Sequence, residues 1–285
     1  MSYANFIPTM WNEQIDRDLE RLCVFVEDCN RKYDGKVSSK GESVRILGVG
    51  KPTIKSVAKA DRNNDIDSAE EIEDTSIIMQ INQIRYFNYK VGDIDKAQAV
   101  DGLMNALEEE TTEGLANEVD KYIASMAKDS NIKQVYSSAK KVVTGTAGSG
   151  EVNVLQALRD AKKLLTKNDV KANTKVVATV DADFEDLFTA EYENKHTDNT
   201  TDLKNGAIGM YHKMVIKASN NVAVDSSSNS LIMVRTQRAI AFCKPLTHTE
   251  AYRPEKGFAD AVKGFILFDA KVVRPKEVVV LNVNY

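Results

Sequence analysis

Apolar side chains recur every three or four positions in three stretches of the chain, a spacing typical of amphipathic helices. The first stretch covers residues 11–33 and carries Ile15, Leu19, Leu22, Val26, Cys29 and Tyr33. The longest covers residues 96–128 and follows Asp95, which with Gln98 predicts a capping box. At about 1.5 Å per residue, this helix would be a rod of roughly 50 Å. The third stretch predicts a helix over residues 154–165 that ends near Asn168.

Runs of β-branched and aromatic residues predict strands through most of the remaining chain. Residues 41–57 predict a hairpin of two short strands, because glycines and a proline interrupt the run, and residues 76–94 predict one long strand. A buried strand over 174–181 precedes a short helix or turn over 182–193. Further strands are expected over 207–221, 230–246 and 262–285, with a turn at "DSSSNS" and a break at Pro275. This order predicts an α+β fold and not the alternating pattern of a doubly wound sheet.

Two acidic segments stand out from the evenly mixed charges of the chain. The stretch "DRNNDIDSAEEIED" (61–74) holds seven acidic residues and one basic residue. An EF-hand calcium loop that began at Asp61 would need glycine and glutamate where Ile66 and Ile72 stand, so a solvated loop tip is favoured. The second segment, "EEETTE" (108–113), lies on the long helix and is either a solvated face or a source of ion pairs between subunits.

The stretch "VVTGTAGSGEV" (142–152) is the most enzyme-like feature of the sequence. Its glycines follow the pattern G-x-x-G-x-G, which differs from the dinucleotide fingerprint and from the phosphate loop. The preceding "SSAKKVVTG" is also too short and too polar for a central parallel strand. We interpret the stretch as a flexible joint, in which Gly145 and Gly148 free the backbone and Ser149 caps the next helix.

Other chemistry has little local support, and we predict no catalytic, cofactor-binding or metal-binding residues. His196 lies in a polar loop, His212 on an expected strand, and His248 beside Glu250, with no spacing that would bring two histidines to one metal ion. The serine hydrolase pattern GxSxG does not occur. Cys23, Cys29 and Cys243 are an odd set without close pairs, which favours reduced thiols.

The overall charge restricts the partners. A net charge of −4 gives no positive field that would attract nucleic acid or an anionic membrane, so contact with either would be local. No apolar run approaches the ~20 residues of a membrane span, so no membrane partner is expected.

Six segments in a fixed order resemble the major capsid proteins of tailed bacteriophages with the Hong Kong 97-type fold, within the coat-like group of short-tailed phages. They are "MWNEQIDRDLERLCVFVEDCNRKYDGKV", "KGESVRILGVGKPTIKSV", "QINQIRYFNYKVGDIDKAQAVDGLM", "GLANEVDKYIA", "NGAIGMYHKMVIKASNNV" and "FADAVKGFILFDAKVVRPKEVVVL". The resemblance implies an N-terminal arm over 1–38 and an extended β-hairpin loop over 39–91. It further implies a peripheral domain over 92–182 with its spine helix at 95–129, an axial domain over 183–250, and C-terminal strands over 251–285 that complete the core.

The implied function is self-assembly into hexamers and pentamers that form an icosahedral head around double-stranded DNA. Assembly contacts are expected from Asp65, Glu70 and Glu71 on the extended loop, and from Glu108 and Glu109 on the spine helix. The resemblance also implies a separate scaffolding protein, a portal, decoration proteins, and weak non-specific contact with packaged DNA. The protein would be assembled in the host cytoplasm and end in the virion.

Two alternatives remain open at this point. An encapsulin-type nanocompartment shell would have the same fold and would enclose an enzyme instead of DNA. A nucleotide-dependent enzyme would use the glycine stretch "GTAGSG".

Overall fold

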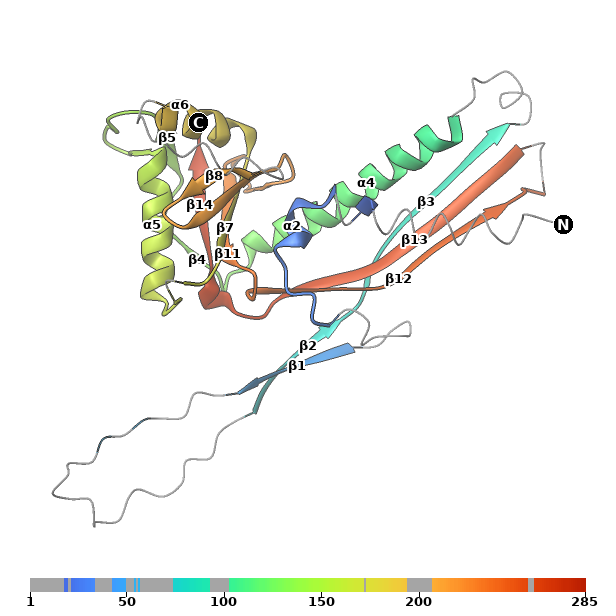
Figure 1. The fold of residues 1–285 in the computed structure, drawn as a ribbon, viewed down its shortest axis with the longest axis horizontal. Coiled ribbons are helices and arrows are strands. Elements are labelled where there is room, and N and C mark those ends of the chain that lie inside the picture. The colour runs from blue at the N-terminus through green and yellow to red at the C-terminus, as the bar shows by residue number, and fades with distance from the viewer. Residues whose placement is uncertain are drawn as a thin grey trace, which may run out of the picture.

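The computed structural model describes residues 18–19, 22–33, 43–49, 54, 56, 74–92, 103–171, 173–193, 207–255 and 259–285. The helices there are α2 (Val24–Glu27), α4 (Leu103–Ser125), α5 (Val154–Lys167) and α6 (Ala182–Glu193), with 3₁₀ turns η3 (Met126–Lys128) and η4 (Pro275–Glu277). The strands form one sheet of nine, one of three and a ribbon of two. Figure 1 shows the long helix α4 lying along the three-stranded sheet, with α5 and α6 gathered at the opposite end of the molecule.

The nine-stranded sheet is the larger body. Its main path runs β6 (Glu151–Asn153), β5 (Lys140–Val143), β14 (Val278–Asn284), β11 (Ser230–Thr236), β7 (Val176–Val180), β9 (Met214–Ala218) and β8 (Ala207–Tyr211). Two short strands join it at the side, β4 (Lys133–Gln134) on β14 and β10 (Ala223–Val224) on β11. One face of this sheet shares a core with α5 and α6, and the other shares a core with α2 and α4.

The three-stranded sheet carries α4. It consists of β12 (Ile240–Tyr252), β13 (Ala259–Val272) and β3 (Gln83–Gly92), all antiparallel. Tyr122 of α4 donates a 2.8 Å hydrogen bond to Asp269 and packs edge-on against Phe268. Arg85 on β3 lies 3.6 Å from Glu118 of α4. The long helix is therefore held to this sheet by apolar packing and by polar contacts along its length.

The ribbon pairs β1 (Ser43–Val49) with β2 (Asp74–Gln80), from Ser43 opposite Gln80 to Val49 opposite Asp74. The expectation of a local hairpin within 41–57 is wrong, because the partner of the first strand lies about thirty residues further along the chain. The expected single strand over 76–94 is also divided at Ile81 and Asn82, with β2 in the ribbon and β3 in the three-stranded sheet.

Two of the predicted helices are confirmed with changed ends. The long helix occupies Leu103–Ser125 and continues as η3 to Lys128, while the predicted Asp95–Gln98 capping box lies outside the described residues. The helix α5 ends as expected at Asn168. Its cap is Asn153, whose side chain accepts from the Leu155 amide, and not Ser149 as predicted. The reason is that β6 occupies residues 151–153 and moves the start of the helix beyond the glycines.

The predicted helix over 11–33 is confirmed only in part, because Asp18, Leu19 and Leu22 are helical but the helix is interrupted at Cys23. Cys23 has an extended backbone with ψ 116°, and the helix that follows it spans only Val24–Glu27. The apolar stripe is nevertheless buried at Leu19, Val26 and Cys29. Leu22 of the same stripe is 47% exposed, so the stripe is buried only in part, and two separate helical segments carry it.

Three other strand predictions need correction. Residues 207–221 form the hairpin β8–β9, in which His212 and Lys213 take the turn with φ of 50° and 62°. Residues 230–246 divide between β11 and β12, which belong to different sheets. The polar segment before the glycine stretch, judged unsuitable for a parallel strand, contains β5, which pairs in parallel with both β14 and β6. The break of the C-terminal strands at Pro275 is confirmed by η4.

The predicted domain boundaries do not separate the sheets. The boundary at 182/183 falls between β7 and β9, which pair with each other, and the boundary at 250/251 falls inside β12. One apolar cluster also joins α4, β11, β13 and β14 across both large sheets. The division into arm, extended loop, peripheral domain and axial domain therefore stays a prediction about function.

Gly264 supplies a stability test within the three-stranded sheet. A Cβ at this position would lie 2.6 Å from Cζ of Phe87 and 2.8 Å from the carbonyl oxygen of His248. We expect Gly264→Ala to lower the free energy of unfolding by about 1–3 kcal/mol, since the strand or the ring must move. Urea unfolding of the unassembled chain measures the change.

The matched control is Gly114→Ala on α4, where no atom lies within 4 Å of the added Cβ. Alanine should raise the stability there by about 0.5–1 kcal/mol, because glycine is the poorer helix former. Equal effects of the two substitutions would contradict the packing described for Gly264.

Candidate assembly surface

Residues 24–29, which we call the arm segment or simply the arm, are held in place by four charged side chains from other elements. We call these four the arm clamp: Asp120 of α4, Lys175 before β7, Lys217 of β9 and Arg235 of β11. Asp120 is 2% exposed and accepts the backbone amides of Val24 (2.8 Å) and Phe25 (3.1 Å). A carboxylate at these first amides favours the start of a helix. Capping from α4 therefore explains why α2 begins at Val24.

Arg235 is fully buried in the middle of the nine-stranded sheet. Its guanidinium donates to the carbonyl oxygens of Phe25 (2.8 Å) and Asp28 (3.1 Å) and contacts Sγ of Cys29 at 3.1 Å. It also lies over the Phe25 ring, 5.5 Å from the centroid. Because a buried guanidinium needs partners, the residues of α2 and the turn after it form part of the environment that this side chain requires.

Asp28 is the buried anion of the arm clamp. It is 1% exposed, with Lys217 Nζ 2.6 Å from one carboxylate oxygen and Lys175 Nζ 3.0 Å from the other. Burial alone would raise the pKa of Asp28, but the two lysines outweigh it and hold the pKa below its usual value. Lys217 also contacts Glu27, and these two carboxylates outweigh burial and raise the pKa of Lys217.

Asp120 differs from Asp28 because it forms no ion pair with a lysine of the described residues. Burial raises its pKa to about 6, and the Val24 and Phe25 amides offset part of that rise. Its oxygens are used by the backbone of the arm. The four side chains of the arm clamp together hold the arm segment against α4, β7, β9 and β11. Their role is therefore to position this segment.

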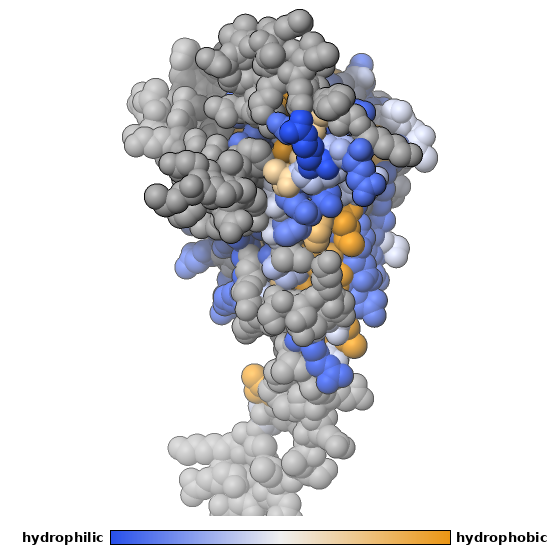
Figure 2. Space-filling model, turned by 90° about the vertical axis from the view of Figure 1, so that its right-hand side faces the viewer, coloured by the Kyte–Doolittle hydropathy of each residue, from blue (hydrophilic) through white to orange (hydrophobic). Residues whose placement is uncertain are grey.

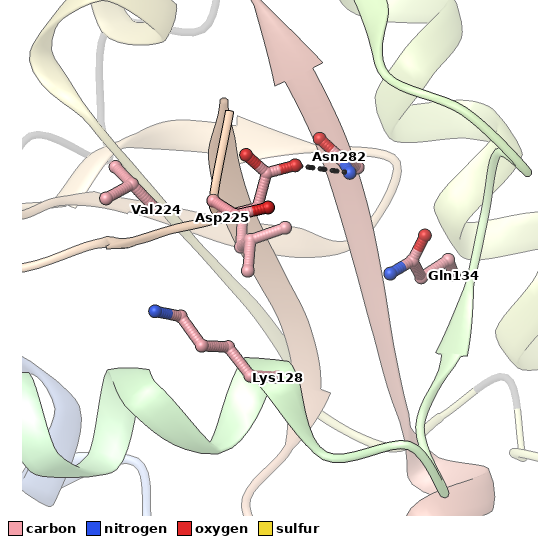
Figure 3. A pocket seen from close by; sticks show the side chains of 7 residues that line it. Lys128, Gln134, Val224, Asp225 and Asn282 are labelled. Carbon is pink, nitrogen blue, oxygen red and sulfur yellow. Dashed lines mark hydrogen bonds between the residues drawn. The ribbon is translucent and has the colours of Figure 1, made fainter. Parts of the chain in front are cut away.

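A hollow of 480 Å³ lies where η3, the turn after β10 and β14 meet (Figure 3). Lys128, Gln134, Asp225 and Asn282 supply its polar atoms. Asp225 accepts the side-chain amide (3.0 Å) and the backbone amide of Asn229, the backbone amide of Ser227 (2.7 Å) and the side-chain amide of Asn282 (3.2 Å), and these bonds lower its pKa to about 2. Its carboxylate is therefore committed to shaping the turn between β10 and β11.

The expected assembly residues are only partly described. Asp65, Glu70 and Glu71 lie outside the described residues. Glu108 is half-buried on α4, and burial, with Asp18 and Glu109 nearby, raises its pKa, whereas Glu109 is exposed. Glu118, further along α4, forms ion pairs within the same chain, with Arg85 and with Lys121. The role of Glu108 and Glu109 in contacts between subunits stays a prediction.

The glycine stretch is held by hydrogen bonds to two neighbouring elements. Gly145 and Gly150 have φ of 73° and 86°. Of the two glycines expected to free the backbone, Gly145 therefore has a conformation that favours glycine, whereas Gly148 has no positive φ. The Gly145 amide donates to Glu191 (2.7 Å), and its carbonyl accepts from Asn153 (2.7 Å). These bonds join the stretch to α6 and β6 and argue against a flexible joint.

The surroundings of the described histidines and of the three cysteines indicate a structural role for these side chains. His212 stacks edge-on against Tyr211 in the β8–β9 turn, and His248 lies against Phe265, while Glu250 pairs with Lys263 at 3.1 Å. His196 lies outside the described residues. The three cysteines are free and buried.

Over the described ranges, His, Cys, Asp and Glu form no group of three that could hold a metal ion. In the same ranges, no helix has the length and apolarity to cross a membrane.

Some apolar side chains are left on the surface. Figure 2 shows a stripe of apolar residues between hydrophilic ones on the end of the molecule that faces right in Figure 1. On the face of β3 that points away from α4, Ile84 is 55% exposed and Tyr86 is 80% exposed. On the ribbon, Ile78 is 44% exposed. Exposed apolar residues of this kind are common at protein interfaces.

Sequence reasoning missed the whole arm clamp. The one signal was Arg235 in the otherwise apolar run "SLIMVRT", where a charge in a buried strand requires partners. Nothing local could identify Asp120 or Lys217 as those partners, because about a hundred or more residues separate each from the arm segment.

Proteins similar to this chain are found among solved structures. No protein-family model matches the sequence, and no curated protein matches it. Among solved structures, one described as Mycobacterium phage Che8 is 27% identical, with a TM-score of 0.68 over 92% of this chain and 91% of that chain. The capsid structure of cyanophage P-SCSP1u is 13% identical, with a TM-score of 0.67 over 92% and 88% of the two chains.

A virus-like particle from Pyrococcus furiosus is also similar, at 11% identity and a TM-score of 0.58 over 99% of this chain and 100% of that chain. Its TM-score is lower than those of the two phage structures. The likeness to the phage structures extends over nearly all of the chain. The chain therefore has the fold of phage capsid proteins, as its sequence predicted.

We test the arm clamp by the pH dependence of Asp28→Asn. Because the folded pKa of Asp28 is lowered, its contribution to stability is present above its ordinary value of 3.8 and is lost as the pH falls through the folded value. We expect the substitution to cost about 2 kcal/mol of unfolding free energy at neutral pH and progressively less below pH about 4. Urea unfolding across this range measures it.

Asp186→Asn is the matched control, since Asp186 is exposed on α6 and belongs to no ion pair of the described chain. It should leave the stability unchanged at every pH. A cost for Asp28→Asn that stays constant down to acid pH would contradict the lowered pKa.

Proposed function

We propose that this chain is the major capsid protein of a bacteriophage and that it assembles into hexamers and pentamers around double-stranded DNA. The observation that carries the proposal is the likeness to phage capsid structures over nearly the whole chain. Repeated contacts of modest strength are sufficient for such a shell, because closed symmetry multiplies each contact over many copies.

The ribbon β1–β2 supports a role in association. Two-stranded ribbons are marginal on their own, since they have no core. Here Val44, Ile46 and Met79 pack against Ala241, Cys243 and Leu267, so the root of the ribbon is anchored to the body. Ile78 and Arg45 remain exposed on the same ribbon. In our proposal a neighbouring copy supplies the missing burial, and the acidic residues between the two strands meet basic groups of that copy.

The remaining partners follow from the proposed role. A separate scaffolding protein, a portal and decoration proteins would complete the head. Contact with packaged DNA would be weak and non-specific, because the chain carries a net charge of −4. The protein would be assembled in the bacterial cytoplasm and would reside in the virion. Its task is association, and we propose no enzymatic activity.

An encapsulin-type shell is the second candidate, favoured by the likeness to the virus-like particle. Such a shell would use the same contacts and differ in its contents. Purified particles that hold a cargo enzyme and no packaged genome would favour this candidate over the phage capsid.

Electron microscopy of the purified chain tests the proposal. We expect closed shells from the intact chain and a folded, unassembled subunit from a variant that lacks residues 61–74, because the deletion removes the proposed contact and leaves the described cores intact. Circular dichroism and sedimentation velocity establish folding and assembly separately.

Each result has a clear meaning. Normal shells from the deletion variant would contradict the proposed role of the loop. A monodisperse monomer from the intact chain at high concentration, with a co-expressed scaffolding protein as well as alone, would contradict the capsid function itself.

A further inference from the structure

The two helices that cover the outer face of the nine-stranded sheet carry opposite charges. α5 presents Lys162, Lys163 and Lys167, of which the last two are exposed. Its one acidic residue, Asp160, is bound by Tyr136 and Gln156. The side of the body formed by α5 is therefore positive.

The helix α6 has the reverse composition. It contains no lysine or arginine, and Asp183 and Asp186 are exposed while Glu185 is half-buried. None of these three carboxylates forms an ion pair in the described part of the chain, and the same holds for Lys162, Lys163 and Lys167. Within the described residues, both faces thus carry charges that no ion pair offsets.

Helix dipoles explain only part of this pattern. Asp183 and Glu185 stand in the first turn of α6 and Lys167 in the last turn of α5, where each is favourable. Lys162 and Lys163 lie away from both ends of α5, and the charge of Lys213 from the β8–β9 turn acts on Lys162. Burial and the charge of Lys213 together lower the pKa of Lys162, in the direction expected of cations that lie close together.

The two faces cannot neutralise each other within one copy. α5 and α6 touch, but they run in different directions, with α5 along the outer side of the body and α6 across its end (Figure 1). The absence of any ion pair between them in the described chain agrees with this arrangement. Complementary patches on different sides of one subunit suit a head-to-tail contact, and such contacts generate closed rings when the rotation closes.

We propose that the basic face of α5 in one copy docks against the acidic face of α6 in the next copy of the ring. The proposal rests on the proposed shell function and assigns the ring contact to described residues. It is independent of the contact expected from residues 61–74. Rim charges of this kind guide the encounter of subunits and select their register more than they add affinity.

Charge reversal tests the proposal through assembly of the full chain. One variant carries Lys162→Glu, Lys163→Glu and Lys167→Glu, and a second carries Asp183→Lys, Glu185→Lys and Asp186→Lys. Each variant places like charges across the contact, so we expect the yield of shells to fall by about tenfold or by a larger factor. Sedimentation and electron microscopy measure the yield, and circular dichroism should show that the subunits remain folded.

Two combinations then restore complementarity. A chain with all six substitutions has both faces inverted and should recover shells toward the level of the intact chain. Equal amounts of the two reversed variants can alternate around a ring of six but not around a ring of five, so the mixture should recover hexamers, and this recovery places the contact between copies. Where lysines at the start of α6 prevent folding, Asp183→Asn, Glu185→Gln and Asp186→Asn should give a smaller loss in the same direction.

Three results would overturn the proposal. The reversed variants could assemble as well as the intact chain, or neither combination could restore assembly. Alternatively, the α5 variant could form normal shells that retain less DNA, which would assign the basic face to nucleic acid. Failure of the proposed function is distinguishable, because the intact chain itself would then form no shells.

Discussion

A buried arginine in the middle of the large sheet determines how the rest of the molecule is arranged. Arg235 is fully buried, and its hydrogen-bond partners come from Phe25, Asp28 and Cys29. A guanidinium in such a place is costly unless it is paired, so the arm segment has to occupy the space between β11 and α4. Removal of the segment would leave Arg235 without these partners, and also Asp120 and Lys217.

This requirement joins parts of the chain that would otherwise be loosely connected. The segment contacts α4 through Asp120, which fixes the long helix against the nine-stranded sheet. The same helix lies on the three-stranded sheet through Tyr122 and Asp269. One apolar cluster then covers residues of both sheets. The body is consequently one unit, from which the ribbon projects and on which the charged faces of α5 and α6 remain available.

The sequence predicted the elements that depend on local pattern. The presence of α4 and its end near Lys128, the end of α5 at Asn168 and the break at Pro275 followed from periodicity and from residue chemistry. The α+β class and the resemblance to phage capsid proteins also followed from patterns along the chain. These features can be predicted from the sequence because residues close together in the chain determine them.

The remaining features depend on partners far away in the chain. The helix expected over 11–33 is interrupted because Asp120 caps a new start at Val24, and β1 pairs with β2 instead of forming a local hairpin. β5 is polar and short, yet β14 and β6 pair with it on both sides. Of the candidate contacts, Glu108 and Glu109 could be placed on α4, but the arm clamp could not be foreseen, since only folding brings Asp120, Lys217 and Arg235 together.

Native-state hydrogen exchange at the amides of Val24 and Phe25 in the unassembled subunit examines whether the arm belongs to the body. These amides donate to Asp120, and the segment that follows them supplies the partners of Arg235. They should exchange with the same opening free energy as the amides of β11 and β14, since the arm and the sheet would open together. Rapid exchange of the arm amides while the sheet stays protected would contradict this account.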